Sequence, residues 1–567
     1  MGDWKAGLKK LKPKLKKREQ RGSDSSVCPN GASESDQDAS AWKTGVKPLK
    51  KCASKDTGRP PKSRKGSTKP KRIHTKDTIP STSTLRGIYG HPPPTTNPTG
   101  ESGQQTTLAL PSFEELPKVI LTQSSEFKEP DDWVSAGATL QPLGGGKGRV
   151  LRVRIGLDLG TAYTKVALRA ADQVFFVDWD GLRISSQRYF LPGELSSRDS
   201  GSLWPGRPDD ATETFCALKA PFLSDCKNLS GNVAASIAFL AWVMRYARAW
   251  LYRHQASLVG NRRLVWEVNI GCPIDPWCST SSRENLSQVG ICAWKLSQEQ
   301  CYITLAAAKE LLHTRPLSPA LVGMDNLDIV PEFVAQIAGY LNSPQGKEDG
   351  LHLLADVGAG TLDIAAFNVF HPKKDDPSNV RLPIFTGTVE PLGTHVLMAN
   401  RLKDTSLGKC GWNDLNGIPS VERIVVEFGI DGGELNRSDE LFIKWLHHCV
   451  GRILDYTKKY REPGAEAWKE GMRIFLTGGG AACAIYKSGI IRAFSTMGTK
   501  PLFTTFPMLE AAAKCVGEHD FHRVSVAFGL TYDAESIGTM VQPKDIEDIE
   551  PAAHIREFPD RDELYPK

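Results

Sequence analysis

The chain has 567 residues, of which 40% are apolar and 24% charged, a composition typical of a globular protein with room for two or three domains. Its formal charge of +6 hides two parts of opposite sign: residues 1–80 carry 22 Lys/Arg and 8 Asp/Glu (+14), and the remaining 487 carry 49 and 57 (−8). No run of eighteen apolar residues exists, which argues against a membrane-spanning helix, and the first residues do not resemble a secretory signal. The twelve cysteines form no CxxC pair, which argues against a disulfide framework and a zinc site. A cytoplasmic setting is therefore expected.

The basic region, residues 1–110, is rich in Lys, Ser, Thr, Pro and Gly and is predicted to be a disordered arm, because it has too little apolar surface to offset the entropy of ordering. Its first residues have an apolar stripe at helical spacing: Trp4, Leu8, Leu11 and Leu15. Three interpretations stay open for the arm: a solvated, non-specific tail, contact with nucleic acid phosphates, or attachment to an anionic membrane or a partner. Residues 111–148 are expected to be a linker.

From residue 150 the pattern changes to alternating strands and helices. In chain order we expect a strand–turn–strand unit at 152–170, a helix at 232–252, a strand at 264–272, helices at 282–296 and 329–341, a second strand–turn–strand unit at 351–369, a helix at 439–461, a strand running into a glycine turn at 472–481, and a final helix at 524–532. Such a mixture predicts an α/β body, in two lobes.

Three segments share one design, an apolar strand followed by a glycine-rich turn: 156–165 (GLDLGTAYTK), 355–363 (ADVGAGTLD) and 475–481 (FLTGGGA). Glycine-rich turns allow successive backbone N–H groups to form a concave anion site. A carboxylate that precedes the turn, such as Asp158 or Asp356, binds Mg²⁺ directly or through water, and the metal bridges phosphate oxygens. Two such turns with one acid each predict a clamp for a nucleoside triphosphate.

In this order the three segments resemble the phosphate-1, phosphate-2 and adenosine motifs of the actin/Hsp70/sugar-kinase ATPase superfamily, and most closely the nucleotide-binding domain of Hsp70-type proteins. The likeness spans about 152–535. Segment 268–273 with the helix after it resembles the strand and helix before the family's connecting segment, 329–335 resembles its first interdomain helix, and 527–529 its second.

The resemblance implies a two-lobed actin-like fold made of duplicated ribonuclease-H-like subdomains. It places an ATPase domain at 149–540, with lobe I at about 149–345 and lobe II at about 346–540, and a tail at 541–567. About 30 residues follow the last motif, so we expect a protein without the peptide-binding domain of Hsp70.

The resemblance also implies roles for individual residues. Asp158 and Asp356 would organise Mg²⁺ through water, in the family's manner, and Lys219, Glu332 and Thr361 would act on the γ-phosphate and the attacking water. The remaining residues would hold the nucleotide: Gly160, Thr161, Ala162 and Tyr163 in the first turn, Gly358, Ala359 and Gly360 in the second, and Gly478, Gly479 and Gly480 at the adenosine. Three positions depart from the family pattern: Ala162, Phe333 and Ala482, where the family has a hydroxyl residue, a proline and an adenine-stacking arginine.

The expected function is that of an Hsp70-like switch that binds Mg·ATP, hydrolyses it slowly to ADP and phosphate, and changes its affinity for a protein partner. The lobes would close on the nucleotide across hinges near Glu332 and Gly529. Two alternatives remain: an actin-like ATPase that assembles into filaments, and a nucleotide-gated scaffold with negligible turnover. A sugar or acetate kinase is disfavoured, because no small-substrate motif accompanies the turns.

Overall fold

The computed structural model describes residues 109–550 except 114, 115, 118, 120, 122–131, 183–187, 224–231, 301, 314–316, 343–348, 372–379, 404–417, 515, 518 and 519. The basic arm predicted for residues 1–110, apart from its last two residues, and its apolar stripe lie outside the described residues. Among the helices that are described, none is long and apolar enough to cross a membrane.

The first sheet has strands in the order β3-β2-β1-β8-β9, and β4 also pairs with β2. The strands are β1 (Val150–Asp158), β2 (Tyr163–Ala170), β3 (Gln173–Phe176), β4 (Leu191–Pro192), β8 (Arg263–Cys272) and β9 (Asn326–Pro331). β1, β2 and β3 are joined antiparallel, whereas β8 and β9 continue the sheet parallel to β1. The carboxyl ends of β1, β8 and β9 therefore lie along one edge of the sheet.

The second sheet repeats this plan. Its order is β14-β13-β10-β11-β12-β15, from β10 (Gly350–Val357), β11 (Leu362–Val369), β12 (Arg381–Glu390), β13 (Met472–Thr477), β14 (Pro501–Thr504) and β15 (Thr539–Val541). Here β10, β11 and β12 are antiparallel, and β13 and β14 run parallel to β10. The two sheets thus share one strand order, with β10 in the place of β1; β15 is an additional parallel strand on β12.

The remaining elements are a small third sheet and the helices. The third sheet, β6-β5-β7, consists of β5 (Leu195–Arg198), β6 (Leu203–Pro205) and β7 (Ala211–Phe215). The α-helices are α1 (Asn232–His254), α2 (Ala256–Val259), α3 (Ile274–Cys278), α4 (Thr280–Leu296), α5 (Leu305–His313), α6 (Glu332–Leu341), α7 (Thr394–Arg401), α8 (Val421–Phe428), α9 (Gly432–Tyr456), α10 (Ala467–Glu470), α11 (Ala484–Thr496), α12 (Glu510–Ala513), α13 (Phe521–Gly529) and α14 (Ala534–Ile537).

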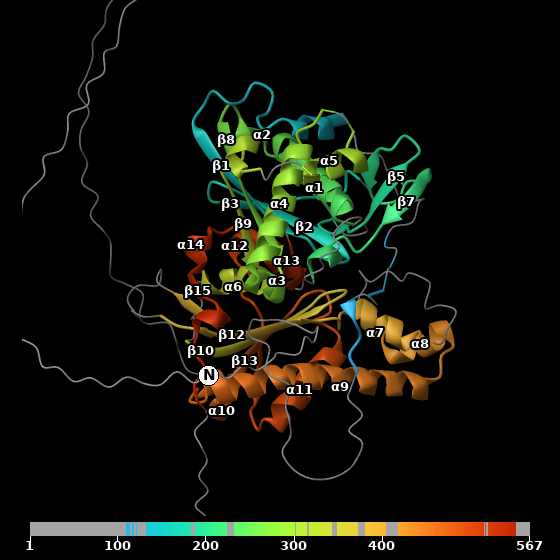
Figure 1. Ribbon diagram of the computed structural model, residues 1–567, viewed down its shortest axis with the longest axis vertical. Helices are drawn as coiled ribbons and strands as arrows, with labels where there is room; N and C mark the ends of the chain where they lie inside the picture. The colour runs from blue at the N-terminus through green and yellow to red at the C-terminus, as the bar shows by residue number, and fades with distance from the viewer. Residues whose placement is uncertain are drawn as a thin grey trace, which may run out of the picture. The chain divides into compact units, whose positions relative to one another are not determined.

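Helices α6 and α13 lie between the two large sheets (Figure 1). The ring of Phe333 in α6 lies 5.7 Å from that of Phe367 in β11, and Gly156 of β1 lies against the backbone of Ala527 in α13. The two helices cross closely, since a Cβ atom at Gly529 would lie 1.6 Å from the carbonyl oxygen of Ala335. The crossing therefore requires glycine at position 529.

The outer faces of the sheets carry other helices. Residues 233–251 of α1 are all buried, so this helix is apolar around most of its circumference, apart from the buried Arg245 and Arg248. The second sheet packs α9 and α11 on its outer face, where Phe442 and Tyr486 meet edge to face at 5.8 Å (Figure 1).

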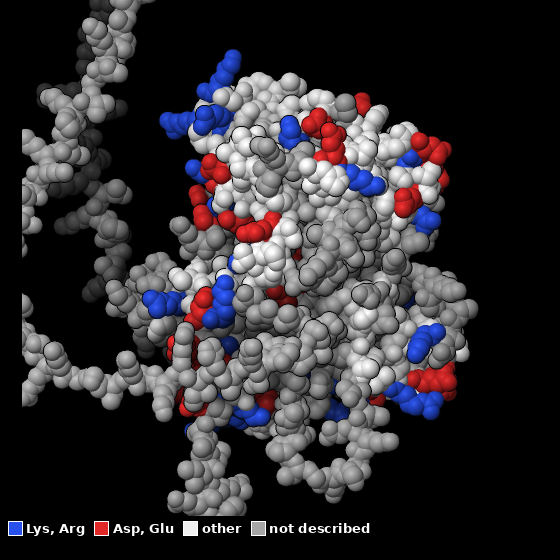
Figure 2. Space-filling model, viewed as in Figure 1, with Lys and Arg blue, Asp and Glu red and all other residues white. Residues whose placement is uncertain are grey.

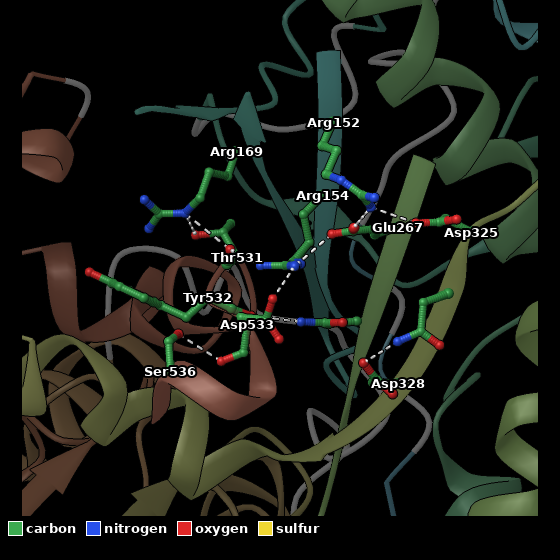
Figure 3. Close-up of polar contacts among 12 residues, drawn as sticks. Arg152, Arg154, Arg169, Glu267, Asp325, Asp328, Thr531, Tyr532, Asp533 and Ser536 are labelled. Carbon is green, nitrogen blue, oxygen red and sulfur yellow. Dashed lines mark hydrogen bonds and ion pairs between the residues drawn. The ribbon is translucent and has the colours of Figure 1, made fainter. Parts of the chain in front are cut away.

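The segment after α13 is joined to the first sheet by a polar network (Figure 3). Arg154 of β1 contacts Glu267 of β8 at 2.6 Å and Asp533 at 2.9 Å, and the Nε atom of Arg169 donates to the carbonyl oxygen of Thr531 at 3.0 Å. Arg169 also stacks on the ring of Tyr532 at 4.4 Å. These contacts fix the end of α13 on the sheet whose β1 leads into the first glycine turn.

The structure confirms a mixed α/β body and most of the predicted elements, including both strand–turn–strand units and the helices near 232–252, 282–296 and 439–461. One helix prediction begins too early. Residues 329–331 end strand β9, and α6 begins only at Glu332, because Pro331 lacks the backbone N–H that a helix interior requires. The last helix begins at Phe521 instead of 524.

Candidate functional site

A cleft with an empty volume of about 880 Å³, part of it open to solvent, lies where the three glycine turns meet. The predicted site residues that line it are Asp158, Gly160, Thr161, Ala162, Tyr163, Lys219, Glu332, Asp356, Gly358, Ala359, Thr361, Gly478 and Gly479. Gly360 and Gly480 are not among the lining residues. The fold therefore brings nearly all of the predicted residues into one cavity.

The first turn joins β1 to β2. The antiparallel register pairs Asp158 with Lys165, and the Nζ atom of Lys165 lies 2.9 Å from Oδ2 of Asp158. The N–H of Gly193 donates to the carbonyl oxygen of Ala162 at 2.6 Å, so this carbonyl is bonded to the backbone before β5. The turn thus offers one acid with a lysine directly opposite.

The second turn joins β10 to β11 and is held by the start of α7. Three N–H groups at 393–395 donate to the carbonyl oxygens of the turn residues 358–360, at 2.7 to 3.1 Å. Carbonyl oxygens would repel a phosphate, and here three of them are bonded to the helix. A Cβ atom at Gly360 would lie 3.1 Å from Cγ2 of Thr161, so the first and second turns approach each other closely.

The third turn follows β13, which is parallel to β10. Gly478 has φ +82°, and a Cβ atom there would lie 2.1 Å from Oδ1 of Asp356, so this glycine makes room for the carboxylate. A Cβ atom at Gly479 would meet nothing within 4 Å, whereas one at Gly480 would lie 2.3 Å from Cγ1 of Val357. Gly479 therefore faces open space and Gly480 serves packing.

Lys219 and Glu332 form a buried ion pair in the cleft. The Nζ atom of Lys219 lies 2.7 and 2.8 Å from the two carboxylate oxygens, and both residues are buried. Burial opposes the charge of Lys219, but Glu332, Asp363 and Asp158 raise its pKa above the ordinary lysine value, so it stays protonated. Burial raises the pKa of Glu332 to about 7, against the opposing effect of Lys219.

The loop that carries Lys219 contains a backbone conformation unusual for its residue type. Ala217 has φ 54°, in the left-handed region that only glycine adopts freely. The short 3₁₀ helix Ala220–Phe222 follows Lys219 directly. The chain thus turns sharply on both sides of the lysine, and Ala217 holds a strained conformation there, which is frequent beside functional residues.

Asp356 and Asp363 lie opposite each other on β10 and β11. Burial and the neighbouring charge of Asp158 raise the pKa of Asp356 to about 6, although the Nε2 atom of Gln336 donates to its Oδ2 at 2.7 Å. Burial likewise raises the pKa of Asp363 well above the ordinary value. Within the described residues, Oδ1 of Asp363 is buried without a hydrogen-bond partner.

The charges of the cleft suit a divalent cation. Four carboxylates, those of Asp158, Glu332, Asp356 and Asp363, line the cleft together with three cationic side chains, those of Lys165, Lys219 and Arg523. On the outer face shown in Figure 2, Lys/Arg and Asp/Glu side chains are interspersed. In the part of the chain that is described, no group of three or more His, Cys, Asp and Glu could hold a metal by itself. Mg²⁺ needs only one or two carboxylates with water and phosphate oxygens, so the residues fit Mg²⁺ brought in with a phosphate ligand.

Several lining residues were not identified from the sequence: Lys165, Phe190, Gln336, Thr394, Ile418, His522, Arg523 and Val526. Lys165 lies opposite Asp158 across the hairpin, with residues 159–164 between the two, so the register of the hairpin would have identified it. His522 and Arg523 lie just before the helix predicted at 524–532, so an earlier helix start would have included them. Asp363 was noted only as a structural partner of the turn.

Part of the range expected to be a linker, 111–148, packs against the body. Leu116 lies near the second turn, with its Cδ1 atom 3.6 Å from a Cβ atom built at Gly360, and the N–H of Leu121 donates to the buried carboxylate of Glu194. The 3₁₀ helix Asp132–Ala138 packs on α1, where Nε of Arg248 donates to the carbonyl oxygen of Gly137 at 2.7 Å. Leu116 therefore lies beside the second glycine turn, and the 3₁₀ helix Asp132–Ala138 lies against α1.

Comparisons with protein-family models and with curated proteins found no match to this chain.

Proposed function

We propose that the protein binds Mg·ATP in this cleft and hydrolyses it slowly, as an Hsp70-like switch with a two-lobed actin-like fold. The observation that carries the proposal is the pairing of the first two turns. Two sheets of the same strand order each carry an acid at the end of a central strand (Asp158) or one residue before its end (Asp356), followed by a glycine turn, and both turns line one cleft. In the proposed fold each sheet is the core of one lobe.

In the proposed complex, different residues of the cleft contact different parts of the nucleotide. Backbone groups of the first turn hold the β-phosphate, and those of the second hold the γ-phosphate. Asp158 and Asp356 would hold Mg²⁺ through water, and the ion would neutralise phosphate charge. Gly479 lies beside the nucleoside, where a side chain would intrude.

The proposed chemistry depends on positioning and charge more than on covalent steps. Lys219 remains a cation in the cleft and stabilises negative charge that develops on the transferred phosphoryl group. Glu332, with a pKa raised to about 7, accepts hydrogen bonds at the start of α6 and orients both Lys219 and the attacking water. Thr361 closes the second turn, where its carbonyl oxygen accepts from the N–H of Gly358 at 2.9 Å.

The switch follows from the place of α6 and α13. Both helices lie between the sheets, α6 begins with the cleft residue Glu332, and α13 meets it at Gly529. A change in the cleft that moves one sheet relative to the other must also move α6 against α13 where the two helices cross. Nucleotide state would then set the shape of the body and its affinity for a protein partner.

The nucleotide-gated scaffold with negligible turnover is a second candidate, favoured by one observation. Both oxygens of Glu332 already bind the Nζ atom of Lys219, and this pair must loosen before either side chain can act on a phosphate or a water. An actin-like filament remains an alternative that assembly measurements decide.

The test is to measure ATP hydrolysis and ATP-dependent pelleting for the wild type and for Asp356→Ala. Turnover that is lost in the variant, without pelleting, supports the proposed ATPase. Binding without turnover in either protein supports the scaffold, and pelleting with ATP supports the filament. Absence of any ATP binding by the wild type contradicts all three.

A further inference from the structure

Arg523 is a cleft residue with no role in the proposed function described above. It lies in the first turn of α13, lines the cleft, and has a side chain only 14% exposed. We propose that Arg523 binds the diphosphate shared by ADP and ATP and so makes the site selective for nucleotides with at least two phosphates. This inference rests on the proposed function and adds a residue and a specificity to it.

Aromatic side chains hold the guanidinium beside the first turn. Its Cζ atom lies 4.2 Å from the centre of the Phe190 ring, and Phe190 meets Tyr163 edge to face at 6.3 Å. Tyr163 is the first residue of β2, directly after the turn. Stacking uses the face of a guanidinium and leaves its N–H donors in the plane, where they match phosphate oxygens two at a time.

The charges of the cleft explain why a third cation matters there. Lys165 lies 2.9 Å from Asp158, and Lys219 lies 2.7 Å from Glu332, so each lysine is paired with a carboxylate at close range. Arg523 is the third cationic side chain of the cleft, and it also lies 4.0 Å from the carboxylate of Asp520, which is 56% exposed. Arg523 thus brings positive charge to a cleft that four carboxylates otherwise make unfavourable for a polyanion.

The position of α13 indicates which phosphates Arg523 contacts. The neighbouring residue His522 accepts a hydrogen bond at its carbonyl oxygen from Oγ1 of Thr477, 3.1 Å away, directly before the third turn. Arg523 itself stands next to the first turn through Phe190. It therefore lies between the turn proposed for the nucleoside and the turn proposed for the β-phosphate, where the α- and β-phosphates pass.

The experiment compares the dissociation constants of Mg·ATP, Mg·ADP and AMP for the wild type, Arg523→Gln and Arg523→Lys by calorimetry. Loss of charge-assisted hydrogen bonds predicts that Arg523→Gln weakens ATP and ADP by the same factor, about ten- to a hundred-fold, and AMP by less. Arg523→Lys should recover only part of the affinity, because it keeps the charge and loses the planar fork. Arg492→Gln is the matched control: Arg492 pairs with Glu440 on the outer helices, and its loss should leave all three affinities unchanged.

Two results would overturn the inference without touching the proposed function. In the first, the wild type binds nucleotide and both Arg523 variants keep its affinity for ADP. In the second, the variants lose affinity for ATP only, which would place Arg523 at the γ-phosphate. A wild type that binds none of the nucleotides overturns the proposed function together with the inference. Arg523→Lys, which keeps the cation over Phe190, makes the result independent of any folding defect in Arg523→Gln.

Discussion

The Nζ atom of Lys219 lies within 2.8 Å of both carboxylate oxygens of Glu332, 113 residues further along the chain, and the pair is buried in the cleft between the glycine turns. The contact joins the loop after the small third sheet to the first residue of α6. A buried pair of this kind stabilises the fold only while both partners are present.

Lys219→Met should therefore destabilise the protein in a pH-dependent way. The variant leaves Glu332 buried without its cation, and its pKa, already about 7, must rise further. A carboxyl group whose pKa is raised in the folded state lowers stability increasingly as pH rises, because the unfolded chain ionises first. We expect a loss of about 3–5 kcal/mol at pH 8 and a smaller loss at pH 6 in urea unfolding. The double variant with Glu332→Gln should recover much of it; equal losses at both pH values would contradict this account.

Asp363→Asn should make the protein more stable at pH 8. Burial raises the pKa of Asp363 well above its ordinary value, so the folded state holds this proton more tightly than the unfolded state. Stability from this group is fully present below the unfolded pKa of about 4 and declines as pH rises through the folded pKa. Asparagine removes that decline, with an expected gain of about 1–3 kcal/mol at pH 8 and almost none near pH 4. A loss of stability in Asp363→Asn at pH 8 would show that neighbouring charge, such as that of Lys219, stabilises the ionised carboxylate in the folded state.

Gly478 and Gly479 are neighbours with different requirements. A Cβ atom at 478 would lie 2.1 Å from Oδ1 of Asp356 in a left-handed backbone, whereas one at 479 would meet nothing within 4 Å. Gly478→Ala should lower the melting temperature by several degrees. Gly479→Ala should leave it unchanged and weaken ATP binding instead. If Gly479→Ala binds ATP as the wild type does, the nucleoside does not lie against this turn.

Gly529 and Gly339 provide a matched pair at the crossing of α6 and α13. A Cβ atom at Gly529 would lie 1.6 Å from the carbonyl oxygen of Ala335, but at Gly339 its nearest contact, with Phe528, would be an ordinary 3.8 Å. Gly529→Ala should destabilise the fold by about 1–3 kcal/mol or more through overpacking. Gly339→Ala should be neutral or stabilising by up to about 1 kcal/mol, because alanine favours the helix. Equal effects of the two substitutions on denaturant midpoints would argue against a tight crossing.

The parts of the fold that were predictable from the sequence are those encoded locally. The alternation of apolar residues before each glycine turn predicted the two strand–turn–strand units, and the structure has them at β1–β2 and β10–β11. The long apolar repeat at 232–252 predicted α1 nearly to its ends. The third sheet and β12 were missed, because their short or irregular apolar patterns cannot be distinguished from loops.

The site was predictable to the extent that its residues belong to the turns. Residues that reach the cleft through tertiary contacts were not identified, and Arg523 and Gln336 are examples. Arg523 comes from a helix start more than 350 residues after the first turn, and Gln336 reaches Asp356 from the first helical turns of α6. Helix starts are set by tertiary contacts as well as by local signals, so the sequence pattern placed these residues poorly.

The most direct measurement of the central claim is a calorimetric titration of the full chain with ATP, with Mg²⁺ and again with EDTA. The account predicts one ATP per chain, tighter binding with Mg²⁺, and loss of that Mg²⁺ dependence in Asp356→Asn. A wild-type titration without heat of binding at millimolar ATP, or binding that neither Mg²⁺ nor Asp356→Asn alters, would contradict a nucleotide site between the glycine turns.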